Sequence, residues 1–322
     1  MGHWIDGHCD TVLKKFYEQH ELKSTDFSEE FQATSDLLLE GGIDVQVAAM
    51  WIPTAFAKFG LDIALEMFGI LYEDVQKDAK LVQIKNKSDF SKVQVKTKLG
   101  YILGLEGAEP IGNNLKLLPA FYELGIRLIT LTWSRKNMFG EGVQKEVRLD
   151  EGEGLSQLGK QLVAAMNELG IVVDVAHLNR NGFQDVVKHS KSPFIASHTC
   201  AYSLVEHERN LSDEQIKLIA ESDGCIGITF VPEFLVPNPK KEPATIEHVI
   251  EHLQYVVDLV GIDYVGLGSD FDGIDKAPIG LENASKFKEL LPHLKEKGFS
   301  KKDIDKIMGE NWHRVFRAVW TS

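Results

Sequence analysis

The chain of 322 residues has few cysteines and no long uninterrupted apolar segment. Cys9, Cys200 and Cys225 are its three cysteines; they cannot form a fully paired disulfide framework and contain no Cys-x-x-Cys pair. This usage is typical of a reducing compartment, so we expect a cytoplasmic protein. No stretch of about 18 uncharged apolar residues occurs, and charged residues interrupt the first apolar run, so we expect neither a membrane span nor a signal peptide.

Basic clusters and nucleotide-binding glycine patterns are also missing. The net charge is −13, without a basic tail or a lysine cluster on one expected helix, which argues against nucleic-acid binding. No Gly-x-Ser-x-Gly elbow, Rossmann fingerprint or Walker pattern occurs. The sequence therefore favours neither a serine hydrolase of the α/β-hydrolase type nor a common nucleotide-binding protein.

What the chain does contain is a series of eight short, β-branched runs. Their nearly continuous apolar character is typical of parallel strands that are buried on both faces. The expected strands are Trp4–Cys9, Ile43–Trp51, Tyr101–Leu105, Arg127–Trp133, Ile171–Ala176, Phe194–Ser197, Cys225–Val231 and Tyr264–Ser269.

Helical patterns fill the intervals between these runs. The expected helices are Phe56–Ala79, Leu155–Leu169, Ser212–Ala220, Ile246–Val260, Ala284–Lys297 and Lys302–Val319. This alternation predicts an α/β fold, a (β/α)8 TIM barrel that forms a single domain over residues 1–322. A doubly wound open sheet is the second choice, because the turn after the first run lacks phosphate-binding glycines. We expect Ser134–Glu153 to be a loop over the barrel mouth.

Six side chains that can bind metal ions stand at the C-terminal ends of the expected strands. A parallel barrel gathers these ends on one face, so residues from distant parts of the chain can meet there. Three histidines, two aspartates and one glutamate form a ligand set that is typical of a two-metal hydrolase. The six residues are His8, Asp10, Glu106, His177, His198 and Asp270.

Each of these residues also has a plainer structural interpretation. His8 and Asp10 share a strand face and can hold one ion, but Asp10 can equally cap a turn. Glu106 can bridge two metal ions or form half of a salt bridge. A single histidine at a strand end is more often a core residue, whereas two at equivalent places, His177 and His198, favour metal binding.

Other residues near these strand ends also need an interpretation. Asp270 can serve as a general base or form an Asx turn, and Asp272 shares its strand face but lies farther from the strand end. Asp174 can support a metal ligand or cap a turn. Cys9 should point away from His8 and Asp10, so we expect it in the core.

Taken together, these residues resemble the membrane (renal) dipeptidase family of zinc peptidases, which belongs to the amidohydrolase-type barrels. The resemblance runs from Ile5 to about Phe316. It is carried by Asp6-Gly7-His8-Cys9-Asp10, Leu105-Glu106-Gly107, Gly125-Ile126-Arg127 with Leu131-Thr132, Asp174-Val175-Ala176-His177, Ser197-His198, Arg209-Asn210 and Gly268-Ser269-Asp270-Phe271-Asp272-Gly273.

The resemblance implies a dipeptidase that hydrolyses the amide bond of dipeptides, with L-Xaa-D-Xaa as the expected class. Two zinc ions per chain would share a hydroxide. His8 and Asp10 would hold one zinc ion, His177 and His198 the other, and Glu106 would bridge the two. A homodimer is compatible with the family, whereas the membrane tether of its mammalian members is not expected here.

The resemblance also implies roles around the metal ions. Asp270 would transfer the proton, and Arg209 would bind the C-terminal carboxylate of the substrate, although Arg209 can also form a surface salt bridge with Glu206 or Glu208. Trp133 stands where mammalian relatives carry a histidine. Because an indole donates one hydrogen bond but does not titrate, we expect Trp133 to shape the substrate pocket.

Another departure and two other functions remain open at this point. Relatives often continue Glu-Gly-Gly-His after the third strand, where this chain has Glu106-Gly107-Ala108-Glu109. The first alternative function is another amidohydrolase reaction, on an N-acyl amino acid, on a lactone or by deamination. The second is a non-catalytic binding barrel, against which the intact ligand set counts.

Overall fold

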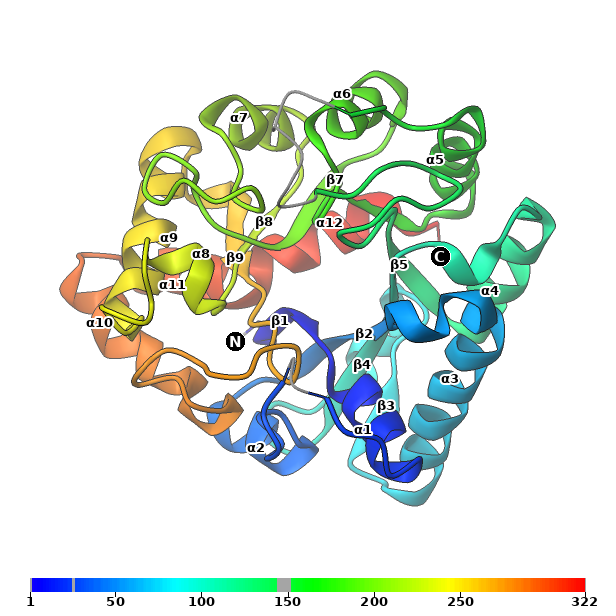
Figure 1. Cartoon of the computed structure of the whole chain (residues 1–322). Coiled ribbons are helices and arrows are strands. Elements are labelled where there is room, and N and C mark those ends of the chain that lie inside the picture. The colour runs from blue at the N-terminus through cyan, green and yellow to red at the C-terminus, as the bar shows by residue number, and fades with distance from the viewer. Residues whose placement is uncertain (1, 25–26, 144–151, 322) are drawn as a thin grey trace.

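The computed structural model describes residues 2–24, 27–143 and 152–321. Within these residues, eight parallel strands follow one another in the order β1-β2-β4-β5-β6-β7-β8-β9, and β3 (Leu81–Gln83) pairs with β4. A parallel bridge between Cys9 and Phe271 joins the first strand to the segment after the last one. The expected TIM barrel is confirmed, with helices arranged around the strands (Figure 1).

Each of the eight expected runs overlaps one strand of the barrel. Several strands are shorter than expected because the chain leaves the ladder where the polar residues begin. The strands are β1 (Ile5–Cys9), β2 (Val45–Trp51), β4 (Leu99–Glu106), β5 (Ile126–Thr130), β6 (Val172–Asp174), β7 (Phe194–Thr199), β8 (Ile226–Ile228) and β9 (Val265–Leu267).

The helices lie mostly between consecutive strands and cover the outside of the barrel. Helices α1, α2, α4, α6 and α8 were not among the expected helices. The helices are α1 (Thr11–Gln19), α2 (Ser35–Gly41), α3 (Gly60–Lys77), α4 (Leu118–Leu124), α5 (Gln157–Leu169), α6 (Arg180–His189), α7 (Asp213–Glu221), α8 (Pro232–Leu235), α9 (Ile246–Val260), α10 (Leu290–Glu296), α11 (Lys301–Asp305) and α12 (Asn311–Val319).

Three of the expected helices are wrong as continuous α-helices. The segments Thr54–Phe59 and Ala284–Glu289 are 3-10 helices that precede α3 and α10. A π-helical turn, Lys306–Glu310, separates α11 from α12. A capping box at Ser212 opens α7, since its side chain accepts a hydrogen bond from Gln215 N and the Gln215 side chain accepts from Ser212 N.

Helix α12 closes the N-terminal end of the barrel with the ring of Trp312. Asn311 Nδ2 donates to the Val265 carbonyl, and Trp312 Nε1 donates to the Leu267 carbonyl at 3.0 Å. Three strand glycines make room for the indole: a Cβ at Gly7, Gly227 or Gly266 would lie 2.5, 3.0 or 2.6 Å from Trp312 atoms. The lumen is thus filled by a side chain at the N-terminal end of the strands, whereas their C-terminal ends remain accessible.

The expected mouth loop Ser134–Glu153 is described only in part, because residues 144–151 lie outside the described residues. Its first part contacts the strand ends. Val143 N donates to the His177 carbonyl at 2.7 Å, and Gly142 forms an antiparallel bridge with Leu178. The described residues contain no helix with the length and apolar character that a membrane crossing requires.

Candidate metal centre

The six predicted metal-capable side chains converge at the C-terminal end of the barrel. Glu106 ends β4, His8 is the penultimate residue of β1, and His198 lies near the end of β7. Asp10, His177 and Asp270 follow β1, β6 and β9 within three residues. The strand ends of a parallel barrel therefore bring together residues that are up to 262 positions apart.

One side of the cluster is built from β1 and the segment after β9. His8 Nε2 lies 3.4 Å from Asp10 Oδ2, 3.8 Å from Glu106 Oε2 and 3.9 Å from Asp270 Oδ1. The ligand atoms of His8, Asp10 and Asp270 all lie within 4.8 Å of one another. A single cation can therefore reach this group of donors.

The other side is built from β6 and β7 and shares the same glutamate. Glu106 Oε1 lies 2.8 Å from His177 Nε2 and 3.6 Å from His198 Nε2, and the two imidazole nitrogens are 2.9 Å apart. The two oxygens of Glu106 thus face different histidines. This is the arrangement that a carboxylate needs in order to contact two cations at once.

Buried polar atoms without partners test whether this cluster fits metal ions. Both ring nitrogens of His8 and Oδ1 of Asp10 are buried and have no hydrogen-bond partner among the described atoms. Such atoms cost free energy unless something satisfies them. Imidazole nitrogens together with carboxylate oxygens are the donors that zinc and similar divalent cations take in proteins. The residues present therefore fit a metal centre.

The pKa values of the clustered groups shift in opposite directions. Burial raises the pKa of Glu106 well above its usual range, and the Asp10 carboxylate adds to the rise. Burial lowers the pKa values of His177 and His198 well below theirs. Burial also acts to lower the pKa of His8, but the carboxylates of Glu106 and Asp10 raise it to about 10. Without a cation the cluster retains a proton, which metal binding would displace.

Asp270 lies at the rim of this cluster. Its side chain is 15% exposed, while the side chain of His8 is 1% exposed. Burial, together with the Asp10 carboxylate, raises the pKa of Asp270 to about 7 against the lowering effect of His8. His177 and Asp270 both have a φ of 66°, a conformation that non-glycine residues seldom adopt and that is frequent at functional sites.

Arg209 approaches the cluster from the loop after β7. Its Nη2 donates to the His198 carbonyl at 3.4 Å, and its guanidinium lies 5.3 Å from the centre of the Phe234 ring. Arg209 Nε is buried and has no acceptor among the described residues. The alternative salt bridge to Glu206 or Glu208 does not form within this part of the chain.

A cavity of about 670 Å³ opens beside His177 and Arg209. Trp133, Val231 and Phe234 form apolar parts of its wall. The Trp133 ring lies 4.9 Å from the Trp51 ring and 5.7 Å from the His177 ring, measured between ring centres. Trp133 thus lies beside His177 in the wall of this cavity.

Sequence reasoning missed the polar residues behind the cluster. Ser134 Oγ lies 2.7 Å from His177 Nδ1, and Ser197 Oγ lies 2.8 Å from His198 Nδ1. The role of Asp174 was left open, and it contacts Ser197. Asp272 faces away from the cluster and accepts from Thr11 Oγ1 at 2.6 Å. The available signal was position, because Ser197 directly precedes a predicted metal ligand.

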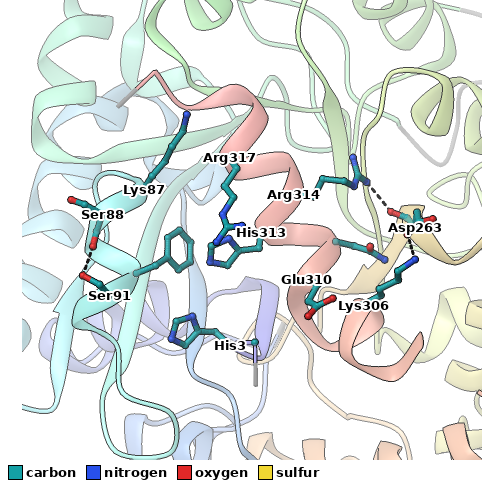
Figure 2. Close-up of a pocket in the computed structure, with 13 residues that line it drawn as sticks. His3, Lys87, Ser88, Ser91, Asp263, Lys306, Glu310, His313, Arg314 and Arg317 are labelled. Carbon is teal, nitrogen blue, oxygen red and sulfur yellow. Dashed lines mark hydrogen bonds and ion pairs between the residues drawn. The ribbon is translucent and has the colours of Figure 1, made fainter. Parts of the chain in front are cut away.

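A larger cavity of about 980 Å³ lies at the opposite end of the barrel, against α12 (Figure 2). His3, Lys87, His313 and Arg317 are among the residues that line it, and Lys306 there forms an ion pair with Asp263. It contains none of the predicted site residues. In TIM barrels the chemistry lies at the C-terminal ends of the strands, so size does not make this cavity the functional site.

Comparison with known proteins agrees with this geometry. A family model described as membrane dipeptidase (peptidase family M19) matches residues 2–322. The chain belongs to this family. Membership confirms the resemblance that the sequence motifs indicated.

Two curated relatives show how far the similarity extends. Dipeptidase tcpJ of Claviceps purpurea is 36% identical over 222 residues, which are 69% of this chain and 51% of that protein. An uncharacterized protein from the pqqA 5′ region of Klebsiella pneumoniae is 31% identical over 264 residues, 81% of this chain and 97% of that protein. The match thus spans about half the length of the fungal relatives and nearly all of the bacterial one.

Solved structures confirm the barrel over the whole chain. A metallo peptidase from Rhodobacter sphaeroides, liganded with a phosphinate mimic of the dipeptide L-Ala-D-Ala, is 28% identical, with a TM-score of 0.89 and 99% coverage of both chains. A dipeptidase of family M19 is 29% identical, with the same TM-score and coverage. The eight-stranded TIM barrel is therefore the architecture that this chain shares with M19 metallopeptidases.

Proposed function

We propose that this protein is a metal-dependent dipeptidase that uses two zinc ions and prefers L-Xaa-D-Xaa dipeptides. The observation that carries the proposal is the placement of Glu106, whose Oε2 faces His8 and whose Oε1 faces His177 and His198. Family membership and the structural relative bound to an L-Ala-D-Ala mimic support the substrate class.

The proposed metal ligands come from five residues of this chain. His8 and Asp10 would hold one zinc ion, His177 and His198 the other, and Glu106 both. When bound, the two ions would polarise the scissile carbonyl and lower the pKa of water towards about 7, so that a nucleophile is present near neutral pH.

Asp270 is the proposed proton carrier. Its Oδ1 lies 3.9 Å from His8 Nε2, and its partly exposed side chain can reach both the cluster and a molecule in the mouth. A carboxylate in this place accepts the proton of the attacking water and returns it to the leaving amine. Its position at the rim supports this role rather than that of a buried ligand.

Arg209 is the proposed anchor for the substrate's C-terminal carboxylate. Its guanidinium is held by the His198 carbonyl and the Phe234 ring, and its buried Nε lacks an acceptor. A carboxylate can accept two parallel hydrogen bonds from such a planar group. Trp133 and Phe234 would then enclose the substrate side chains.

A cytoplasmic location is part of the same proposal. Cys9, Cys200 and Cys225 are all buried with free thiols. Unpaired buried cysteines are typical of proteins that remain in a reducing compartment.

The decisive experiment combines metal analysis with a substrate panel. We expect about two zinc ions per chain and faster hydrolysis of L-Xaa-D-Xaa dipeptides than of their C-terminal amides, N-acyl amino acids or lactones. In Arg209→Lys, which keeps the charge but loses the fork, kcat/KM for free dipeptides should fall by about 10- to 100-fold, while that for dipeptide amides should change little. Zinc-loaded protein that cleaves only lactones or acylated amino acids would refute the dipeptidase assignment.

A further inference from the structure

We propose, building on the metal-dependent function proposed above, that Asp174 fixes the tautomer of His198 through the hydroxyl of Ser197. In this arrangement Asp174 and Ser197 are positioning residues: neither touches substrate, but together they prepare one imidazole nitrogen for the metal centre.

Asp174 is fully buried, and its carboxylate accepts hydrogen bonds from four donors. Its Oδ1 accepts from Ala176 N at 3.0 Å and from Ser197 N at 2.9 Å. Its Oδ2 accepts from Thr130 Oγ1 and Ser197 Oγ, both at 2.6 Å. One oxygen is therefore committed to backbone amides and the other to hydroxyl groups, so the carboxylate cannot turn without losing bonds.

The Ser197 hydroxyl has one proton, and it donates this proton in a hydrogen bond to Asp174. Ser197 Oγ also lies 2.8 Å from His198 Nδ1. Because its own proton points to Asp174, Oγ can only accept there, and Nδ1 of His198 must carry the hydrogen. The lone pair of a neutral imidazole is then on Nε2, which faces Glu106 Oε1 at 3.6 Å and His177 Nε2 at 2.9 Å.

His177 is held differently. Its Nδ1 lies 2.7 Å from Ser134 Oγ, and among the residues that the structure describes no carboxylate accepts a hydrogen bond from the Ser134 hydroxyl. That hydroxyl can donate or accept, so His177 can carry its proton on either nitrogen. Without a cation, His177 Nε2 can donate to Glu106 Oε1 at 2.8 Å or to His198 Nε2 at 2.9 Å. The tautomer of His198 is thus fixed by its neighbours, whereas His177 can adopt either tautomer.

The same Asp–Ser pairing occurs on the other side of the barrel, without an imidazole. Ser269 N donates to Asp6 Oδ1 at 2.8 Å, and Ser269 Oγ donates to Asp6 Oδ2 at 2.6 Å. Ser269 directly precedes Asp270, as Ser197 precedes His198. Its Oγ accepts from Phe271 N at 3.1 Å instead of from a histidine. Ser269 therefore provides a matched control for the loss of a buried serine hydroxyl.

The test is the nitrogen spectrum of the histidines in metal-free protein. With 15N-labelled histidine, the His198 signals, identified by their loss in His198→Gln, should show protonated Nδ1 and unprotonated Nε2 near neutral pH. Ser197→Ala should shift these signals towards a mixture of tautomers, and Ser197→Thr should restore the wild-type pattern. Ser269→Ala should leave them unchanged. Wild-type signals of His198 in Ser197→Ala would overturn the proposal.

Asp174→Asn provides a second variant with the opposite geometry. The Asn oxygen must stay on the side of the two backbone N–H groups, so its NH2 faces the Ser197 hydroxyl. That hydroxyl then donates to His198, and the proton should move to Nε2. A His198 that keeps its proton on Nδ1 in this variant contradicts the proposed relay.

Zinc affinity links the tautomer to function. Competition with a chelator should show zinc binding about 10- to 100-fold weaker in Ser197→Ala than in wild type, and a smaller change in Ser269→Ala. The two proposals fail separately. If the protein binds no zinc, the proposed metal-dependent function is refuted. The nitrogen spectra still test whether Asp174 and Ser197 fix the tautomer of His198. If zinc binds equally well in Ser197→Ala and the His198 signals are unchanged, only the relay falls.

Discussion

At the scale of single residues, the partly exposed position of Asp270 at the edge of the polar cluster makes its carboxylate accessible. It is less buried than His8 and sits on a backbone with positive φ, so its carboxylate can contact an incoming molecule. We expect Asp270→Asn to lower kcat by roughly 10²- to 10⁴-fold with zinc still bound, because the amide cannot accept the proton. Steady-state kinetics with metal analysis measures both. Near-normal turnover would exclude Asp270 as the proton carrier.

Which residues line the centre could be predicted from the sequence, but their partners could not. His8, Glu106, His177 and His198 follow or end apolar strands, and strand ends meet in any parallel barrel. Ser197 ends an expected strand, but neither its sequence position nor that of Ser134 indicates which side chain its hydroxyl contacts. Whether Ser197 reaches Asp174 depends on the pairing of β6 with β7, in which Asp174 lies opposite Ile195. Register of this kind is set by the packed sheet, not by local composition.

At the scale of elements, His252 connects α9 to the loop after β7 and to the last residue of α8. Its Nδ1 accepts from Ala201 N at 3.1 Å, and its Nε2 donates to the Leu235 carbonyl at 3.3 Å. Both nitrogens are satisfied only while the ring is neutral, because a second proton would face the Ala201 N–H. Burial accordingly lowers the pKa of His252 from 6.5 to about 4.

This histidine makes stability depend on pH. Between pH 6.5 and 4 the unfolded chain binds a proton at His252 and the folded chain does not. Its contribution is therefore complete above pH 6.5 and is lost as the pH falls, by about 2 kcal/mol at pH 5. Urea unfolding at pH 7 and pH 5 should show a smaller drop for His252→Gln than for wild type. Equal drops in the two proteins would rule out His252 as a source.

The break between α11 and α12 shows where local patterns fail to predict an element. Apolar residues recur at helical spacing through this segment, which is why one continuous helix was expected. The structure instead has a π-helical turn at Lys306–Glu310, where the backbone of Gly309 lies against β1. A Cβ at Gly309 would be 2.1 Å from the His3 carbonyl oxygen. A contact with the far end of the chain decides this geometry, and no local window contains it.

We expect Gly309→Ala to destabilise the protein by about 1–3 kcal/mol, because the carbonyl of His3 must move. Gly69, inside α3, is the matched control: a Cβ there meets no atom within 4 Å. Gly69→Ala should therefore stabilise by about 0.5–1 kcal/mol. Chemical unfolding of both variants checks the contrast. A Gly309→Ala protein as stable as wild type would show that the His3 carbonyl can move away at no cost in free energy.

For the whole molecule, the alternation of strands and helices was sufficient to predict the barrel. Each expected strand run overlaps one strand, because strands that are buried on both faces are built almost entirely from apolar residues. The helices that cover the barrel were less predictable, and α8 has four residues only. Such short elements form because the barrel holds their ends, so their own sequences carry little information.

Metal binding should stabilise the fold as a whole. The buried and unpartnered Nε2 of His8, which faces the carboxylates, is unfavourable until a cation binds it, and the unfolded chain offers no comparable site. Zinc at 100 times its dissociation constant should add about 2.7 kcal/mol to the free energy of unfolding. Thermal unfolding of chelator-treated protein with and without zinc measures this. In Glu106→Gln the gain should be smaller, and a gain equal to wild type would argue against a shared ligand.

The indole of Trp312 that fills the lumen also limits where small molecules can enter and leave the barrel. Within the described part of the chain, it occupies the barrel axis between Gly7, Gly227 and Gly266. The indole blocks this end of the barrel, so if the chain hydrolyses dipeptides as proposed, the released amino acids must leave by the same mouth through which the dipeptide entered. If Arg209 anchors the substrate carboxylate as proposed, a released amino acid should compete for it, and accumulating product should slow turnover as a competitive inhibitor.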